Sequence, residues 1–576
     1  MQIRFFLVIA QILILYSLVI LIYNIMLLRI FTIVLYCYLL LAISFCIIMN
    51  EGYLSATLNI FKAFSTVGIW TLICRLIGFL RDSMITRYLG SGTMADALFM
   101  STKFPSLMRR IFAEGAMVAA FVPIFSRLHN QEGESQVKLF ASHVYTLMLC
   151  ITLAIVLLIE ALLPGFAMMI APGYACDPEK LNILISFMRW GIPFIFFITL
   201  SAICGAVLQS MMHFSLPSIS LVFGNIFIVI SFLFCKHFIS DPLTIGQSFV
   251  LITTLSALVQ LMINKTACRY YGMSIGFTLS GFKEGWSNLK LFIKKVIPVL
   301  LGSSFAQVNF LVVIALASTL QSGSATYLSL AEKIAQLPGT TIGVVISAGF
   351  LPILSKRISE GNIEKTMRSQ KLVFELVFFI AGCTSLLLFF LAYPIVDMLF
   401  GYGAFTSESV MNTSMALRIS ALGMPAIGLI KLFNTAFYSR KVTLLPAVVG
   451  VLIVFIDIAL SIFLMKFWSY IGLVAASSIA FWMAAITLGI CLAVRRYWTY
   501  DRDTLSFILR LSTVVIISAI LLNYITPIFV SPPNSFAFYK IIRTLSGGAI
   551  GGFIFIGLSV LFRVINVKKW KMMNDA

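Results

Sequence analysis

Charged side chains interrupt apolar segments early in the chain, and their types and spacing suit the binding of an anion. The residues are Arg75, Arg81 and Asp82 in the run CRLIGFLRD, and Lys103 and Arg109 in the run KFPSLMRRIFAEG. A charge at the centre of a membrane-spanning helix costs roughly 2.5 to 3.5 kcal/mol on insertion scales, so such residues usually have a function. With more cations than local anions, the pattern predicts a site that an exogenous anion completes.

The composition indicates that these segments lie in a bilayer. Hydrophobic residues make up 60% of the 576 residues, charged residues only 11%, and the mean hydropathy is +1.04. The net charge of +20 comes from short clusters of Lys and Arg between apolar runs, which is typical of the cytoplasmic face of a membrane protein. We therefore predict an all-α polytopic membrane protein and no nucleic-acid partner.

Several classes of chemistry lack their usual motifs. The ten cysteines form no CxxC pair, and the four histidines show no metal-ligand spacing or HExxH motif. No phosphate-binding P-loop is present. We predict no catalytic residues, no metal site and no cofactor, which argues against a membrane transferase or hydrolase.

Apolar runs long enough to span a membrane recur along the chain, because a spanning helix needs about 20 apolar residues. Fourteen spans are predicted, at 58–80, 94–126, 138–163, 183–211, 217–236, 244–268, 292–320, 326–355, 372–400, 409–438, 444–465, 470–494, 504–527 and 541–565. Residues 1–57 form a further apolar extension, which is either one or two added helices or sequence upstream of the true start, with Met49 as an alternative start. The connections after every second span are basic, so both ends of the fourteen-span unit are expected in the cytoplasm.

An internal repeat divides the core. The run FVPIFSR at 121–127 matches FLPILSK at 350–356, and the pair Ser210 and Pro217 recurs as Ser439 and Pro446 at the same offset along the chain. Six spans separate equivalent points, so the two halves have the same orientation. We expect two six-helix lobes in a parallel pseudo-repeat with a substrate site between them. The last two spans lie outside the repeat.

The predicted helices position the charges of the first half. Arg75 and Asp82 are seven residues apart and share a helix face, so one alternative is that Asp82 simply neutralises Arg75. The span 94–126 is long, and Pro105 is expected to bend or break it beside Lys103. Arg110 and Glu114 are spaced for a pair within the helix, which would make them internal support.

Two further charges lie in apolar spans of the second half. Lys333 precedes Pro338 and is badly oriented for a pair with the adjacent Glu332, so it is expected to face the site from the opposite lobe. Asp457 is a lone carboxylate within 444–465. It either binds a coupling cation or proton or pairs with a cation elsewhere in the chain.

The sequence resembles the MurJ (MviN) lipid II flippases of the multidrug/oligosaccharidyl-lipid/polysaccharide exporter superfamily. The resemblance rests on RLIGFLRD at 75–82, the Asp96 region, KFPSLMRRIFAEGA at 103–116 and FVPIFS at 121–126, and more diffusely on LPILSK at 351–356 and FYSRK at 437–441. It excludes residues 1–57. It implies an N-lobe at 58–271, a C-lobe at 272–500, and C-terminal helices 13 and 14 with a basic tail at 501–576.

The resemblance also implies a function in cell-wall synthesis. Members move lipid II, an undecaprenyl diphosphate-linked muropeptide, from the inner to the outer leaflet of the bacterial cytoplasmic membrane by alternating access. The substrate-binding residues implied are Arg75, Arg81, Asp82, Asp96, Lys103, Arg109 and Glu114, with Lys333 where relatives often have an arginine. This chain departs from the pattern at Cys74, Lys333 and Gln336, and lysine lacks the bidentate fork that arginine offers to phosphate.

The energy source and the partners beyond lipid II and membrane lipids stay open. No match to the sodium site of some members is found, so coupling to a monovalent cation or to the membrane potential is an alternative rather than a prediction. The cell-wall synthesis machinery is a candidate partner. An exporter of another lipid-linked saccharide or of drugs would share the architecture, but it would not need this cationic cluster.

Overall fold

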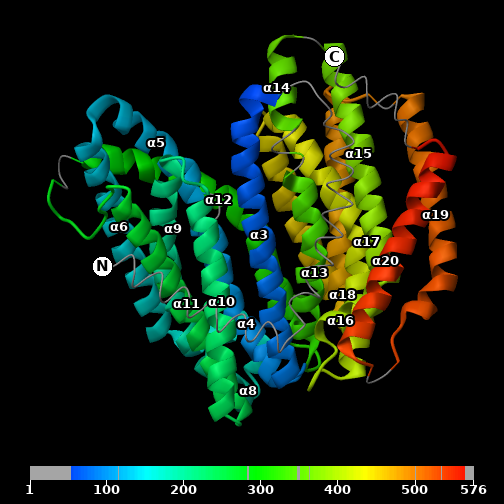
Figure 1. The fold of residues 1–576 in the computed structure, drawn as a ribbon, viewed down its shortest axis with the longest axis horizontal. Coiled ribbons are helices and arrows are strands. Elements are labelled where there is room, and N and C mark those ends of the chain that lie inside the picture. The colour runs from blue at the N-terminus through cyan, green and yellow to red at the C-terminus, as the bar shows by residue number, and fades with distance from the viewer. Residues whose placement is uncertain are drawn as a thin grey trace.

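The computed structural model is helical throughout the part of the chain that it describes (Figure 1). It describes residues 54–564 apart from 114–115, 282–284, 345, 347–349, 362, 500 and 533–534. Helices suit these apolar segments because a helix pairs its own backbone N–H and C=O groups, which find no water in a bilayer. The all-α fold is therefore confirmed. Residues 1–53 of the N-terminal extension, with the predicted extra hairpin and the alternative start, and the basic tail lie outside the described residues, while residues 54–57 belong to the first described helix.

The first half begins with a long helix and continues with paired antiparallel helices. Its helices are α3 (Leu54–Leu89), α4 (Thr93–Ala113), α5 (Ala116–Glu132), α6 (Glu134–Ala161), α7 (Leu163–Ile170), the short 3₁₀ helix η1 (Pro172–Tyr174), α8 (Pro178–Gly191), α9 (Phe194–Ser210), α10 (Ser215–Phe238) and α11 (Pro242–Tyr270).

The second half repeats this order and adds two helices. Its helices are α12 (Trp286–Ala317), α13 (Ser324–Val344), α14 (Leu351–Ser359), α15 (Ile363–Phe390), α16 (Ala392–Phe400), α17 (Ser407–Tyr438), α18 (Leu444–Val494), α19 (Arg502–Phe529) and α20 (Ala537–Leu561).

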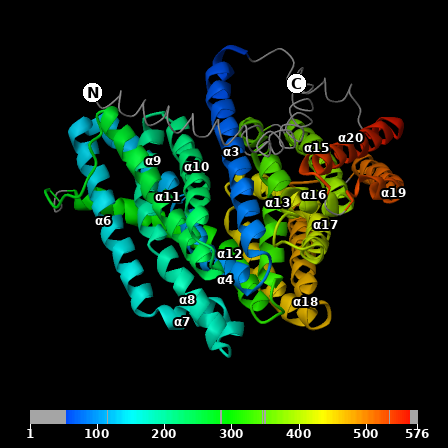
Figure 2. The same cartoon turned by 60° about the horizontal axis from the view of Figure 1, so that its bottom comes forward.

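The helix boundaries reproduce the repeat found in the sequence. Helices α6 and α15 begin at residues 134 and 363, α8 and α17 at 178 and 407, and α10 and α18 at 215 and 444, and each pair is separated by the offset of the sequence repeat. The same offset in three helix starts confirms two parallel halves. Figures 1 and 2 show the first half and the second half side by side, with α3, α4 and α13 near the line where they meet.

Contacts between the halves concentrate on the first two helices of each. Helix α3 packs on α10 and also reaches α16, while α4 packs on α8 and α9 and reaches α12 and α13. Helix α12 lies between the halves, since it packs on α5 in the first half and on α18 in the second. The charged residues identified from the sequence therefore lie on the helices that join the two halves.

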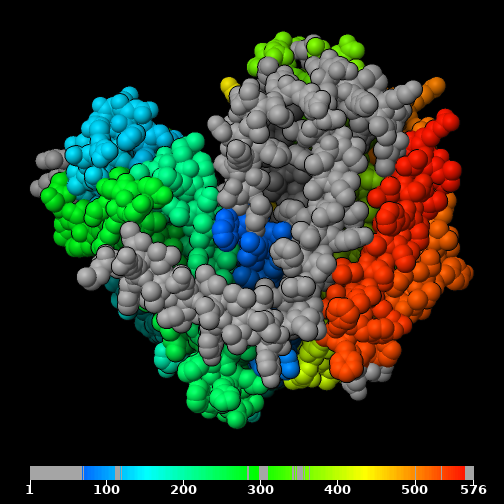
Figure 3. Space-filling model, in the orientation of Figure 1, coloured from blue at the N-terminus to red at the C-terminus, as the bar shows by residue number. Residues whose placement is uncertain are grey.

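The two helices beyond the repeat form an outer layer on the second half. Helices α19 and α20 pack on each other and on α15 and α16, and Figure 3 shows them along one edge of the molecule. Lys540 of α20 forms an ion pair with Asp397 of α16 (Nζ to Oδ1 2.6 Å), with side chains only 9% and 13% exposed. This pair fixes α20 against the C-terminal half.

Among the described residues, nine helices are long and apolar enough to cross a membrane, judged by length and composition. They contain ten of the predicted spans, because α18 holds two of them across a kink at Ser469 (φ 50°). The other four predicted spans correspond to α3, to α4 with α5, to α12, and to α13 with α14. Three of these four spans carry the charges of the candidate site, which makes them less apolar than their neighbours.

The predicted break at Pro105 is absent, and the predicted bend there stays a prediction. Helix α4 continues through that residue to Ala113, and α5 begins at Ala116. Proline removes a single backbone donor, and packing against neighbouring helices compensates for it in membrane helices. Here α4 is packed between α8, α9 and α13.

Candidate functional site

A buried carboxylate joins cations from both halves. Asp82 of α3 accepts hydrogen bonds from Arg81 at Oδ1 (Nη2 3.0 Å, Nε 3.2 Å) and from Lys333 of α13 at Oδ2 (Nζ 2.8 Å). The side chain of Asp82 is 3% exposed, whereas Arg81 and Lys333 are 26% and 30% exposed. The anion is thus buried while both cations keep an accessible side. Lys333 reaches Asp82 from the opposite half of the repeat, which is the direction expected from the sequence.

Neighbouring groups orient these two cations. Arg81 Nη1 donates to Asn225 Oδ1 of α10 (3.4 Å), and Asn225 Nδ2 contacts the sulfur of Cys74 (3.2 Å). Lys333 Nζ lies 4.9 Å from the centre of the Phe99 ring, a cation–π contact. Cys74 therefore takes part in holding Arg81 through Asn225.

A second ion pair joins the halves one residue earlier on α13. Lys103 Nζ of α4 donates to Glu332 Oε2 (3.4 Å) and lies 4.0 Å from the centre of the Phe310 ring of α12. Gln336 donates to Glu332 Oε1, and Arg110 Nη2 donates to Gln336 Oε1 (3.5 Å). Adjacent residues on α13, Glu332 and Lys333, thus bind α4 and α3 respectively. Arg110 reaches the opposite half rather than serving only its own helix.

Further cations surround this core. Arg75, Arg81 and Arg109 are all within electrostatic range of Cys74, which places them on one wall of the site. Lys431 of α17 is within electrostatic range of Arg75 and donates to the carbonyl oxygen of Gly339. The sequence analysis missed Lys431, although a single lysine in the apolar part of span 409–438 was a usable signal. Glu114, and with it the predicted pair with Arg110, lies outside the described residues.

The site carries an excess of positive charge. Among the residues that the structure describes, it contains two carboxylates, Asp82 and Glu332, and seven cations. The cations are Arg75, Arg81, Lys103, Arg109, Arg110, Lys333 and Lys431. Adding Glu114 would lower the formal excess from five to four. Cations gathered in a low-dielectric region repel one another and attract counterions strongly, so this arrangement is suited to a multivalent anion.

The carboxylate of Asp96 lies elsewhere and binds backbone. It is 2% exposed and accepts hydrogen bonds from the backbone N–H of Gly323 (2.6 Å) and from the N–H and hydroxyl of Thr326 (2.8 and 2.6 Å). These groups lie at the start of α13, so Asp96 stabilises the unpaired N–H groups of a helix N-terminus from the other half. In this conformation it holds α4 against α13.

The carboxylate of Asp457 is buried in the second half among neutral donors. Asn309 Nδ2 of α12 donates to Oδ2 (2.6 Å), and the hydroxyls of Ser461 and Ser477 lie 3.4 and 3.1 Å from the carboxylate. The residue is 1% exposed, and Asn309 Oδ1 is buried with no hydrogen-bond partner in the described part of the chain. Uncompensated buried oxygens of this kind fit a cation or a proton.

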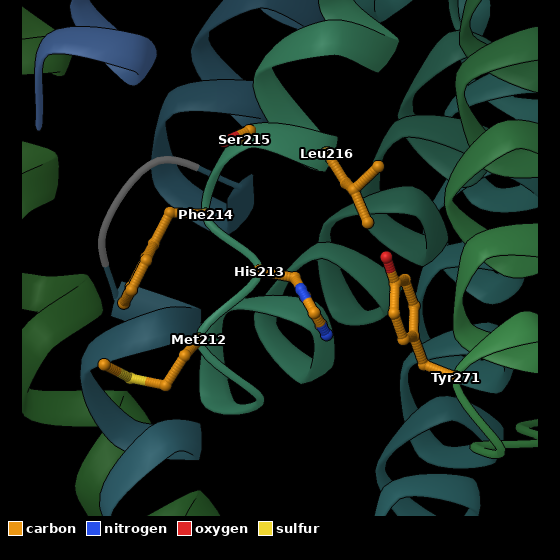
Figure 4. A pocket seen from close by; sticks show the side chains of 6 residues that line it. All are labelled: Met212, His213, Phe214, Ser215, Leu216 and Tyr271. Carbon is orange, nitrogen blue, oxygen red and sulfur yellow. The ribbon is translucent and has the colours of Figure 1, made fainter. Parts of the chain in front are cut away.

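Other features of the surface do not belong to this site. The described residues contain no cluster of three or more His, Cys, Asp or Glu side chains spaced for a metal ion. A small pocket lies at the turn between α9 and α10, where His213 stacks on Tyr271 with ring centres 3.9 Å apart (Figure 4). None of the residues that line it belongs to the cation cluster.

Comparison with known proteins assigns the family. The family model described as lipid II flippase MurJ matches residues 85–542. The chain belongs to the MurJ family. The "Probable lipid II flippase MurJ" of Rhizobium tropici is 30% identical over 452 residues, which are 78% of this chain and 84% of that protein. The "Lipid II flippase MurJ" of Burkholderia cenocepacia is 27% identical over 402 residues, 69% of this chain and 77% of that protein.

Solved structures of two transporters have the same fold as this chain. A lipid II flippase MurJ in an inward closed conformation aligns with a TM-score of 0.68 at 24% identity, covering 86% of this chain and 98% of that one. An inward-facing MATE multidrug transporter of the MOP superfamily aligns with a TM-score of 0.61 at 15% identity, covering 73% and 94%. The family named from sequence motifs and the two-lobe fold are therefore confirmed.

Proposed function

We propose that this protein moves lipid II from the inner to the outer leaflet of the bacterial cytoplasmic membrane for cell-wall synthesis. The observation that carries the proposal is the excess of cations on helices contributed by both halves, around Asp82 and Glu332. A diphosphate is too costly to move through hydrocarbon without compensation, and arginine and lysine replace part of its hydration. Arg75, Arg81, Lys103, Arg109 and Lys333 are the proposed ligands of the diphosphate, with Lys431 as an addition from the structure.

The ion pairs between the halves supply a simple mechanism of alternating access. Asp82 and Glu332 neutralise Lys333 and Lys103 while the two halves are in contact. A bound diphosphate competes with these carboxylates for the same ammonium groups, so substrate binding weakens the bridges across the site. The two halves then rotate relative to each other. During this movement the hydrogen bonds of Asp96 to the start of α13 break, and they form again when the halves return to the present conformation. Binding and conformational exchange suffice, and no covalent step is needed.

Two sources of energy are consistent with the charges. A cation site with an excess of charge responds to the membrane potential, which is worth about 2.3 kcal/mol per charge per 100 mV. Asp457 is the proposed site for a coupling monovalent cation or proton, since its partners Asn309, Ser461 and Ser477 are all neutral. Asp457 lies on α18, which packs on α12, so occupancy of this carboxylate would act on a helix that joins the halves.

The loop charges support one orientation in the membrane. Basic connections favour a cytoplasmic location for both ends of the fourteen-span core, and the tail Lys568–Lys571 would then lie near the inner leaflet. Membrane lipids and the cell-wall synthesis machinery are the proposed partners besides lipid II. The proposed domain organisation is an N-lobe at 58–271, a C-lobe at 272–500 and a C-terminal pair of helices with a basic tail at 501–576.

Binding by the purified protein tests the substrate. The chain in lipid nanodiscs is titrated with lipid II, with undecaprenyl monophosphate and with a cationic dye typical of multidrug exporters. Tightest binding of lipid II is expected, because the site offers several cations to a diphosphate. Binding of the cationic dye in preference to lipid II would contradict the proposal and favour a drug exporter.

A further inference from the structure

Two arginines occupy equivalent positions in the repeat, one in each half. Arg189 of α8 and Arg418 of α17 each lie eleven residues after the first residue of the helix, Pro178 and Ser407. At 1.5 Å per residue this is about 16 Å along the helix. In the proposed topology both helices begin at the same membrane surface, so both arginines lie in the half of the span nearer that surface.

The Arg418 side chain lies on a face of α17 that is directed to lipid. Met411, Met415 and Leu422 share that face and are 49%, 40% and 48% exposed. Arg418 Nη1 lies 3.9 Å from the sulfur of Met415, one turn toward the start of the helix. The guanidinium group therefore extends toward the nearer membrane surface, as a long basic side chain does near a helix end.

The two arginines differ in their counter-charge. Arg189 is within electrostatic range of Glu160 on α6. The position equivalent to Glu160 in the second repeat is Phe389 on α15, which packs on α17 (Figure 1). Arg418 Nε is buried with no hydrogen-bond partner in the described part of the chain, and its sulfur contact is a weak one. The repeat has thus kept the arginine in both halves and the carboxylate in only one.

We infer that Arg418 binds the phosphate group of an anionic phospholipid in the leaflet where α17 begins, which is the outer leaflet in the proposed topology. A phospholipid is the occupant that fits, because the guanidinium lies on an exposed apolar face and extends toward the nearer membrane surface, where lipid phosphate groups lie. The planar guanidinium donates two parallel hydrogen bonds to phosphate oxygens. Arg189, which has Glu160 within electrostatic range, is expected to bind such a lipid less tightly.

Native mass spectrometry of the detergent-solubilised full chain, titrated with phosphatidylglycerol, tests this inference. Arg418→Gln is expected to weaken one lipid-binding step about tenfold or more, the loss typical of a hydrogen bond to a charged group. Phe389→Glu is expected to weaken the same step, because it places a carboxylate where the first half has Glu160. Arg189→Gln is the matched control and should bind the lipid as the unaltered protein does.

The set of variants keeps the test independent of folding and of transport. Phe389→Glu leaves Arg418 in place, so the inference is tested even if Arg418→Gln does not fold. Native mass spectrometry measures bound lipid and does not require flipping activity. The result can therefore be interpreted even if the proposed function is wrong. Unchanged binding in Arg418→Gln or Phe389→Glu, or an equal loss in Arg189→Gln, would overturn the inference.

Discussion

Lys103 and Glu332 occupy equivalent positions of the two repeats, 229 residues apart, and their side chains form an ion pair of 3.4 Å. Equivalent residues of two related halves can touch only next to the axis that relates them. Thr93 and Ser322, also 229 residues apart, touch at 3.2 Å and mark the same axis. The pseudo-twofold axis therefore passes through the cation cluster, so a ligand there contacts both halves at once.

Exchanging the charges of Lys103 and Glu332 tests this relationship. Lys103→Glu alone places two carboxylates together, and we expect transport to fall about tenfold or more, as for loss of a charged hydrogen bond. The double variant Lys103→Glu with Glu332→Lys restores the pair across the axis and should recover thermal stability in detergent. A double variant no more stable than the worse single variant would show that the pair does not join the halves.

Substitution of Asp82 should lower stability and transport more than substitution of either of its cation partners. Asp82→Asn leaves Arg81 and Lys333 close together without their buried anion, and breaking a buried pair typically costs about 3 to 5 kcal/mol. Lys333→Arg retains the charge and adds the bidentate fork, so it should keep transport. Thermal unfolding and complementation of a flippase-depleted strain measure both effects. Full activity of Asp82→Asn would contradict this assignment.

Much of the site was predictable because a charge in an apolar helix is visible in the sequence. Arg75, Lys103 and Lys333 were identified in this way, and the repeat predicted a site between the two halves. The partners of Asp82 were not predictable, because helix spacing offered Arg75 as one alternative, whereas the structure shows hydrogen bonds from Arg81 and Lys333. Arg81 and Lys333 bind Asp82 through side-chain flexibility and a contact between distant helices, and neither is encoded in local spacing.

Asp96 shows a second limit of local reasoning. Motif resemblance placed it with the substrate ligands, while its hydrogen bonds to Gly323 and Thr326 depend on where α13 begins in space. The helix through Pro105 depended likewise on packing against neighbouring helices rather than on proline's intrinsic preference. Properties set by contacts between halves could not be derived from either half alone.

Removing the Asp96 carboxylate should loosen the contact of α4 with α13. Asp96→Ala loses three hydrogen bonds, two of them to backbone groups at a helix start, and we expect a lower thermal midpoint and weak complementation. Thr326→Val is the matched variant, since it removes only the hydroxyl bond, and its effect should be smaller. If both variants lowered the thermal midpoint equally, the hydroxyl bond of Thr326 alone would account for the stabilisation.

Asp457 should make the thermal stability of the protein depend on the monovalent cation present. If the carboxylate binds a monovalent cation, sodium or lithium chloride will raise the thermal midpoint more than choline chloride does at equal ionic strength. Asp457→Asn should abolish that difference, and Ser477→Ala should reduce it, because Ser477 donates to the same carboxylate. A difference between salts that persists in Asp457→Asn would place the ion elsewhere.

The most direct test of the account is the accessibility of lipid II at the outer leaflet in cells depleted of their own flippase. The unaltered chain should restore accessibility, whereas Arg75→Ala and Arg109→Ala should abolish it with normal amounts of inserted protein. Both arginines lie on the cationic wall around Cys74. Failure of the properly expressed unaltered chain, or full accessibility with Arg75→Ala, would contradict the proposal that this cluster carries the lipid-linked diphosphate.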